Sequence, residues 1–291
     1  MCSTFMTLLA FWGIVRPATA QEAATADRSQ YTLFNPTPDR LLREMSTDRP
    51  DITEAPFTVD AGHVQLETTL LGYARSARDD EGATTDSYEL GTTNVRIGLT
   101  DSTEAGFIWQ PYGVVRTHGG RASESWQSGI GGLELRGKIN IWGNNAYEKP
   151  GSTALALMPY VILPTDRHHG VSPEFRESGL IVPFAVKLSD KFALALNGGI
   201  SRNRTDAGSG THTEYIATAS LEYEWTGKVS TYYEVAGRFH TEDERGDEVV
   251  VLGTGITYRW SKDVQFDAGI NIGATPAADR INPFVGLSVR Y

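Results

Sequence analysis

Histidines and their neighbouring carboxylates are the residues of this chain that acid–base catalysis would need. The best candidate group is His240 with Glu242 and Asp243, at the predicted edge of a loop. A catalytic triad is defined by geometry rather than by sequence spacing, so a hydrolase stays open as an alternative. No histidine lies in a familiar nucleophile motif, whether His63, His118, His168, His169, His212 or His240. The sequence therefore favours a protein that is not an enzyme.

Metal and cofactor sites are not expected either. Asp166, His168 and His169 lie together, but adjacent side chains of an extended chain point apart. Zinc needs three or four convergent ligands, which this group does not supply. The glycines of residues 129–132 precede a predicted strand, whereas a dinucleotide motif opens a helix. We expect neither a metal nor a cofactor.

The amino-terminal residues and the net charge set the class of protein. Residues 1–20 are predicted to be a secretory signal, with an apolar core from Leu8 to Val15 and a small-residue cleavage site ending at Ala20. The single cysteine, Cys2, lies in this segment, so no disulfide is expected. The chain carries 36 acidic against 26 basic side chains. This excess of negative charge argues against nucleic acid as a partner.

Strict alternation of apolar and polar residues runs through most of the chain. Between Glu214 and Trp225, the residues of odd number are apolar and most of those of even number are polar, as in a strand with one wet face. About twelve such strands follow His63, joined alternately by long polar loops and short turns. This asymmetry is typical of outer-membrane barrels. We therefore expect an all-β, up-and-down antiparallel transmembrane barrel; a secreted β-sandwich or soluble barrel is the alternative.

Aromatic residues support the membrane assignment. Trp142, Trp225 and Trp260 each border a predicted short turn, and Tyr291 ends the chain at the same level. Trp and Tyr prefer the membrane interface. The closing strand, residues 285–291, also resembles the terminal strand by which barrels are recognised for insertion. The expected partners are thus outer-membrane lipid and, through Tyr291, the barrel-assembly machinery of a Gram-negative-type bacterium.

Two prolines are difficult for this prediction. Pro159 and Pro183 lie inside predicted strands, where each removes a ladder hydrogen bond. Bulges would accommodate them.

Charged side chains gather on the face predicted to point into the barrel. A barrel of eight strands is filled by side chains and one of sixteen is a water-filled pore, so twelve strands leave both possibilities open. The charges either line a narrow pore or pair into a structural network. The predicted lumen-lining residues are Glu67, Arg96, Glu104, Glu134, Arg136, Lys138, Glu222, Glu224, Glu234, Arg238, Asp267 and Arg290.

Residues 21–60 lack periodicity and form a predicted amino-terminal extension before the barrel of residues 61–291. The extension contains Asp48, Arg49, Asp51 and Glu54 between stiffening prolines. This acidic segment is either a plug of the periplasmic mouth, with Lys138 and Arg290 as charge partners, or a solvated tether.

Several motifs resemble one family. Residues 48–59, with Gly62 and residues 65–67, are similar to a motif of the outer-membrane transporters labelled "putative MetA-pathway of phenol degradation". Weaker matches are residues 135–143, residues 163–165 and Pro183. The resemblance covers Ser46 to the carboxyl terminus; Gly132 departs from it, since an acidic residue is expected there. It implies an outer-membrane barrel that passes small hydrophobic or aromatic compounds.

The function expected from the sequence is passive passage of small molecules across the outer membrane. The alternatives are a structural barrel without transport and an outer-membrane hydrolase.

Overall fold

The computed structural model describes residues 27–121, 124–166, 171–204, 210–240 and 248–291. The predicted signal segment, His168, His169, Glu242 and Asp243 lie outside these residues. Within the described chain, no helix is long and apolar enough to cross a membrane. The one helical element described there is a short 3-10 turn, η1 (Asp39–Leu41).

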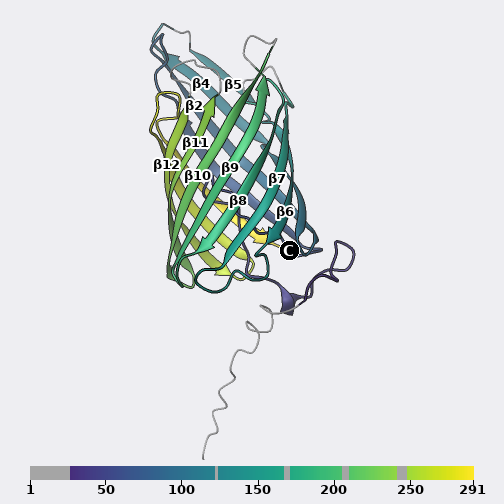
Figure 1. Cartoon of the computed structure of the whole chain (residues 1–291). Helices are drawn as coiled ribbons and strands as arrows, with labels where there is room; N and C mark the ends of the chain where they lie inside the picture. The colour runs from purple at the N-terminus through teal and green to yellow at the C-terminus, as the bar shows by residue number, and fades with distance from the viewer. Residues whose placement is uncertain (1–26, 122–123, 167–170, 205–209, 241–247) are drawn as a thin grey trace, which may run out of the picture.

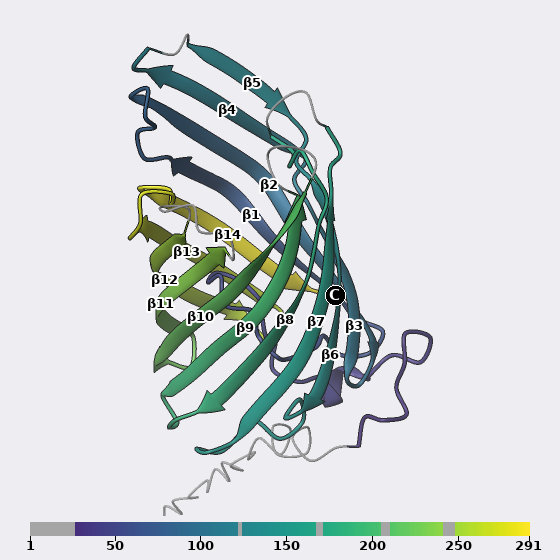
Figure 2. The ribbon, with the colours of Figure 1, turned by 45° about the horizontal axis from the view of Figure 1, so that its top comes forward.

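All the strands belong to one antiparallel sheet that closes on itself, with β1 paired to both β2 and β14 (Figures 1 and 2). The closed barrel has twelve strands around its circumference, which confirms the predicted fold. The strand segments are β1 (Val64–Arg75), β2 (Ala83–Thr100), β3 (Thr103–Trp109), β4 (Tyr112–Gly119), β5 (Ser125–Gly129), β6 (Leu133–Trp142), β7 (Thr153–Leu163), β8 (Glu177–Lys187), β9 (Phe192–Arg204), β10 (Thr211–Thr226), β11 (Val229–His240), β12 (Val249–Ser261), β13 (Val264–Gly273) and β14 (Asn282–Arg290).

Two of the twelve strands are interrupted, which is why there are more segments than strands. β3 and β4 lie end to end as one strand, and both pair with β2. β5 and β6 lie end to end as the next strand, in which β6 pairs with β3 and β5 pairs with β4. The first break lies at Pro111, which has no N–H to donate to a ladder. Gly91 of β2 faces this break with φ +70°, and an added Cβ would lie 3.2 Å from Pro111 Cγ. Glycine thus allows the close approach at this kink.

The alternation predicted from the sequence is visible in the exposure of β10. Glu214, Thr218 and Ser220 are buried inside the barrel, whereas Tyr215 on the outer face is 53% exposed. Successive side chains of a strand point to opposite faces, so the outer surface is apolar and the inner surface polar.

The short connections and the carboxyl terminus lie at one end of the barrel (Figure 1), which we call the turn side. Trp142, Trp225, Trp260 and Tyr291 are all exposed at this end. The connection after β6 is longer than the short turn predicted at residues 143–145, since β7 begins only at Thr153. Its Asn144 amide is hydrogen-bonded to Thr58, so the extra residues contact the amino-terminal extension.

Both prolines are accommodated within strands. Pro159 stays in register with Leu180 of β8, and the ladder from β7 to β6 is interrupted beside it. Pro183 stays in register with Asn197 of β9, and the ladder from β8 to β7 is interrupted. Each proline therefore disturbs one of its two ladders only.

Candidate functional site in the barrel lumen

Residues 44–60, which we call the inserted segment, enter the barrel from the turn side (Figure 2). The base of this segment is closed by an ion pair between Arg43 Nε and Asp60 Oδ1 at 2.8 Å. Arg290 of the last strand joins the pair, because its Nη1 lies 3.4 Å from Asp60 Oδ2 and donates to the Arg43 carbonyl at 2.8 Å. The segment thus forms a loop whose two ends leave through the same mouth.

Arg96, which is fully buried, connects the inserted segment to the barrel wall. Its guanidinium makes two hydrogen bonds to Glu104, at 2.9 and 3.0 Å, and a third to Glu67 at 2.8 Å. It also donates to the carbonyl oxygens of Ser46 and Phe57, at 3.1 and 2.8 Å. Since each of these bonds is charge-assisted and shielded from water, Arg96 fixes both limbs of the loop.

Asp48 completes this charge network. Its Oδ1 lies 2.6 Å from Lys138 Nζ, and its Oδ2 lies 3.3 Å from Arg96 Nε. Burial by itself would raise the pKa of Asp48, but the nearby Arg96, Lys138 and Arg136 outweigh it and lower the pKa to about 2. Asp48 is therefore ionised at neutral pH.

Arg49 binds the adjoining part of the wall, on β13, β14 and β1. Its guanidinium forms a two-point contact with Asp267 of β13, at 2.6 and 3.2 Å, and also donates to Thr69. The same group lies over the Phe284 ring, 5.5 Å from the centroid. The side chain occupies the space above Gly286, where an added Cβ would collide with the guanidinium.

The deepest part of the inserted segment is held through its backbone. The amides of Ile52 and Thr53 donate to Glu234, at 3.0 and 2.7 Å. The Asn197 side chain accepts from the Glu54 amide at 2.7 Å and donates to the Glu54 carbonyl at 2.9 Å. Side chains of the wall thus satisfy backbone groups that a loop inside a barrel leaves unpaired.

Two acids at this tip carry raised pKa values. Burial raises the pKa of Glu54 to about 7, and the negative charges of Asp48 and Glu134 add to this rise, although Arg136 Nη1 lies 3.0 Å away. Burial, together with the nearby Glu234, raises the pKa of Asp51 well above its usual range. Protonation at the tip therefore lowers the cost of keeping these acids inside the barrel.

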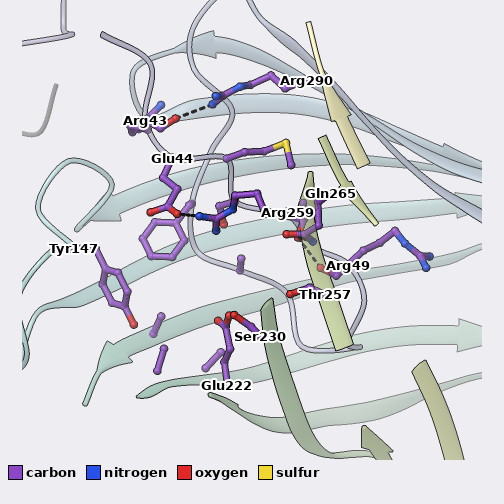
Figure 3. A pocket seen from close by; sticks show the side chains of 18 of the residues that line it. Arg43, Glu44, Arg49, Tyr147, Glu222, Ser230, Thr257, Arg259, Gln265 and Arg290 are labelled. Atoms are coloured by element: carbon purple, nitrogen blue, oxygen red, sulfur yellow. Dashed lines mark hydrogen bonds and ion pairs between the residues drawn. The ribbon is translucent and has the colours of Figure 1, made fainter. Parts of the chain in front are cut away.

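A cavity of about 1220 Å³ lies beside the inserted segment on the turn side (Figure 3). Glu44 and Arg259 form an ion pair in it, and Glu222 lies next to Ser230. Another part of the wall of this cavity is made of small side chains, among them Ala185, Ala193, Ala195, Ser220, Ser230 and Thr257, and further charged side chains such as Arg43, Glu148 and Arg290 line the remainder. Small polar and apolar residues leave room for a solute that charged residues would fill.

The structure divides the predicted lumen-lining residues into several groups. Glu67, Arg96, Glu104 and Lys138 form one network with Asp48, while Glu134 and Arg136 meet Glu54. Glu234 and Asp267 hold the segment at Thr53 and Arg49, and Glu222 lines the cavity. Glu224 is exposed, and Arg238 lies away from the segment, beside Glu177 and Glu214.

Two expected contacts of the segment are absent from the described residues. Arg290, expected to pair with the acids of residues 48–54, instead pairs with Asp60 and with Asp263 at 2.7 Å. Asp51 lies against Ser220 and Glu234 rather than against a cation.

Neutral residues outside the predicted lumen-lining set also hold the segment. Asn197, Thr218, Asn140 and Gln65 all hydrogen-bond to it. They share the strand parity of the charged residues, and this signal would have identified them.

A closed antiparallel barrel with an apolar outer face, a polar lumen and short turns at one end defines an outer-membrane β-barrel. Residues 47–291 match the family model described as "Putative MetA-pathway of phenol degradation", and the chain belongs to this family.

Solved structures give the same fold. The COG4313 outer membrane channel from Pseudomonas putida F1 is 14% identical, with 84% of this chain and 100% of that chain covered and a TM-score of 0.60. The translocator domain of the autotransporter NalP from Neisseria meningitidis is 10% identical, with coverages of 78% and 88% and a TM-score of 0.51. No curated protein matches the sequence.

Proposed function

We propose that this chain is a passive outer-membrane channel for small molecules, and that the inserted segment is its plug. The observation that supports a channel best is the cavity of about 1220 Å³ inside the barrel, which is continuous with the turn-side mouth residues Lys228 and Lys262. A purely structural barrel has no need of such a space. The similar COG4313 structure is described as a channel, which agrees with this proposal.

The solute class follows from the lining and the family. Alanine, serine and threonine side chains give the cavity a wall of mixed polarity, and Tyr147 adds an aromatic ring. The small side chains and the ring suit the apolar body of a small molecule, and the charged side chains of the same wall suit a polar group on it. The family description refers to phenol degradation, so phenolic compounds are the first solutes to test.

The plug role rests on the number of wall strands that the segment contacts. Its residues bind side chains of β1, β2, β6, β9, β11 and β13. A solvated tether would have no reason to meet buried partners on so many strands.

Liposome swelling tests the channel directly. Liposomes containing the purified barrel should swell in small phenolics, while sugars and amino acids serve as comparison solutes. If every solute gives the rate of protein-free liposomes for both the whole chain and a barrel lacking residues 21–58, the channel proposal is wrong.

The same deletion tests the plug. We expect the shortened barrel to fold, because no strand is removed, and to show a higher single-channel conductance. Equal conductance in a correctly folded deletion variant would leave the segment as a tether or partner-binding arm.

A structural barrel and an outer-membrane hydrolase remain the competing functions. The first predicts no flux in any assay, and the second predicts turnover of a lipid or peptide substrate. His240, the candidate acid–base residue, lies beside Glu214 in the lumen.

For assembly, we propose that the last strand is the segment recognised by the barrel-assembly machinery. β14 has an outward apolar face and is followed by the exposed Tyr291. Tyr291→Ala should slow insertion in vivo while leaving the purified barrel's conductance unchanged; normal insertion of this variant would contradict the proposal.

A further inference from the structure

A second cluster of side chains lies in the lumen at the loop side, far along β10 and β11 from the inserted segment. Glu214 is buried, and His212 precedes it by two residues on the same face of β10. His240 of β11 is the cross-strand partner of Glu214 in the ladder. Because side chains of one parity and their cross-strand partners share a face, all three point into the barrel.

The three side chains converge on one point. His212 Nε2 lies 3.1 Å from Glu214 Oε1, and His240 Nδ1 lies 3.5 Å from the same oxygen. One ligand atom from each residue falls within 4.8 Å of the other two. In tetrahedral coordination with metal–ligand distances of about 2.0–2.2 Å, ligand atoms lie about 3.3–3.6 Å apart. The two contacts to Glu214 therefore already have the spacing of such a site.

The surroundings leave this set of ligand atoms free for a cation. Arg238 Nη1 lies 3.3 Å from the other oxygen of Glu214, Oε2, so it orients the carboxylate without occupying Oε1. Arg238 also lies 3.5 Å from Glu177, whose negative charge offsets the guanidinium. Support of this kind from outside the ligands is typical of metal sites.

The Asn203 side chain is hydrogen-bonded to the Glu214 carboxylate. Asn203 of β9 is in register with His212 of β10, and its buried Oδ1 has no hydrogen-bond partner among the described residues. A buried acceptor without a donor is costly unless a cation or water meets it.

We propose that His212, Glu214 and His240 form a binding site for a divalent transition-metal ion of the zinc type inside the barrel. Two imidazole nitrogens and one carboxylate oxygen are ligands that Zn²⁺, Ni²⁺ and Cu²⁺ accept, whereas Ca²⁺ and Mg²⁺ prefer oxygen ligands alone. Three protein ligands leave at least one position for water or for a solute in transit. The inference rests on the barrel geometry alone and does not depend on the proposed transport function.

Calorimetric titration tests the site. The full chain is purified without a polyhistidine tag, stripped with EDTA and titrated with ZnCl₂ in detergent. We expect one equivalent of Zn²⁺ to bind saturably, and His212→Gln and His240→Gln each to weaken binding by at least about tenfold. His118→Gln is the matched control. His118 also contacts a carboxylate, that of Asp86 at 2.9 Å, but it lies on β4, outside the proposed site. Its affinity should equal that of the unaltered chain.

Cobalt gives a second readout. Co²⁺ bound by these ligands should show visible absorption bands that vanish in Glu214→Gln, provided that this variant keeps the barrel's heat-modifiable gel migration. If Zn²⁺ does not bind saturably below about 1 mM, or if the two cluster variants bind it as the His118 control does, the proposal is overturned. Blockade of conductance by Zn²⁺ is not required, so a failure of transport and a failure of metal binding are distinguishable.

Discussion

The guanidinium of Arg49 lies directly above Gly286, in the space that a side chain at this position would fill. These residues belong to the two ends of the chain, the inserted segment and the last strand, and the contact is possible only because Gly286 has no Cβ. Arg49, and with it the inserted segment, can therefore occupy this position only if residue 286 is glycine.

Gly286→Val should displace Arg49 from Asp267 and free the inserted segment. We expect the barrel to fold, because β14 keeps its ladder bonds, and the single-channel conductance to rise toward that of the deletion variant. Gly198→Val is the control, since an added Cβ there meets nothing within 4 Å. A conductance equal to that of the control would show that Arg49 does not hold the segment.

Lys138→Met should weaken the segment through charge. It removes the partner of Asp48 at 2.6 Å and leaves three buried carboxylates around Arg96 alone. Breaking one member of a buried pair costs about 3–5 kcal/mol, because the other charge stays buried. A glutamyl endopeptidase should then cleave after Glu54 faster than in the unaltered chain, and Asp48→Asn in the same molecule should restore part of the protection. Lys191→Met, in an exposed turn, is the control; cleavage no faster than in that control would contradict the assigned pair.

The seating of the segment should depend on pH through Glu54. A carboxyl whose pKa is raised inside the barrel binds its proton more tightly there than in water, so its contribution favours insertion at low pH. That contribution declines as pH rises from the ordinary value of 4.5 to about 7, and Asp51 acts in the same direction. The change is at most about 3 kcal/mol for Glu54. Asp48 has the opposite sign, but its contribution is lost only near pH 2–4.

We therefore expect conductance to increase between pH 5 and pH 8, and Glu54→Gln to flatten this dependence. A conductance that falls over the same range, or an unchanged slope in Glu54→Gln, would be inconsistent with a neutral Glu54 in the seated segment.

The two faces of the wall should differ in their tolerance of charge. Val235 is 45% exposed near the middle of β11, on the outer face, and Val235→Arg should cost about 2–4 kcal/mol at the bilayer midplane. Ser220→Arg, inside the barrel beside Asp51 and Glu234, should cost much less. Urea unfolding in lipid vesicles measures both; equal costs would contradict the lipid-facing assignment of Val235.

The strands could be predicted because successive residues of a strand point their side chains to opposite faces. The period of two in residues such as those of β10 follows from local geometry, and it placed the inward face without any knowledge of pairing. Interruptions of this alternation were harder to predict from the sequence. The kink at Pro111 and the length of the connection before Thr153 depend on contacts with Gly91 and Thr58, which are distant in the sequence.

Partners across the lumen were harder to predict than the faces. Arg290 was expected beside the acids of residues 48–54, but the depth to which the loop inserts brings Asp60 to it instead. In the sequence, His240 was grouped with Glu242 and Asp243 and not with His212, since the proximity of the two histidines depends on the register that opposes Glu214 to His240. The register is set by the whole pair of strands, so no single sequence motif predicts it.

The ion pair of Arg43 and Asp60 has a topological consequence. A chain that passes right through a closed barrel can leave it only if one chain end is pulled through. A loop that enters and leaves by the same mouth can be withdrawn while the barrel stays closed. Arg43 and Asp60 pair at the turn-side mouth, where the inserted segment begins and ends. The segment is therefore a loop that can be withdrawn from the closed barrel. Tension applied from the periplasm to the residues before Arg43 would therefore load the contacts at the mouth first, including this pair and the bond from Arg290 to the Arg43 carbonyl, before it reached the hydrogen bonds of the inserted residues.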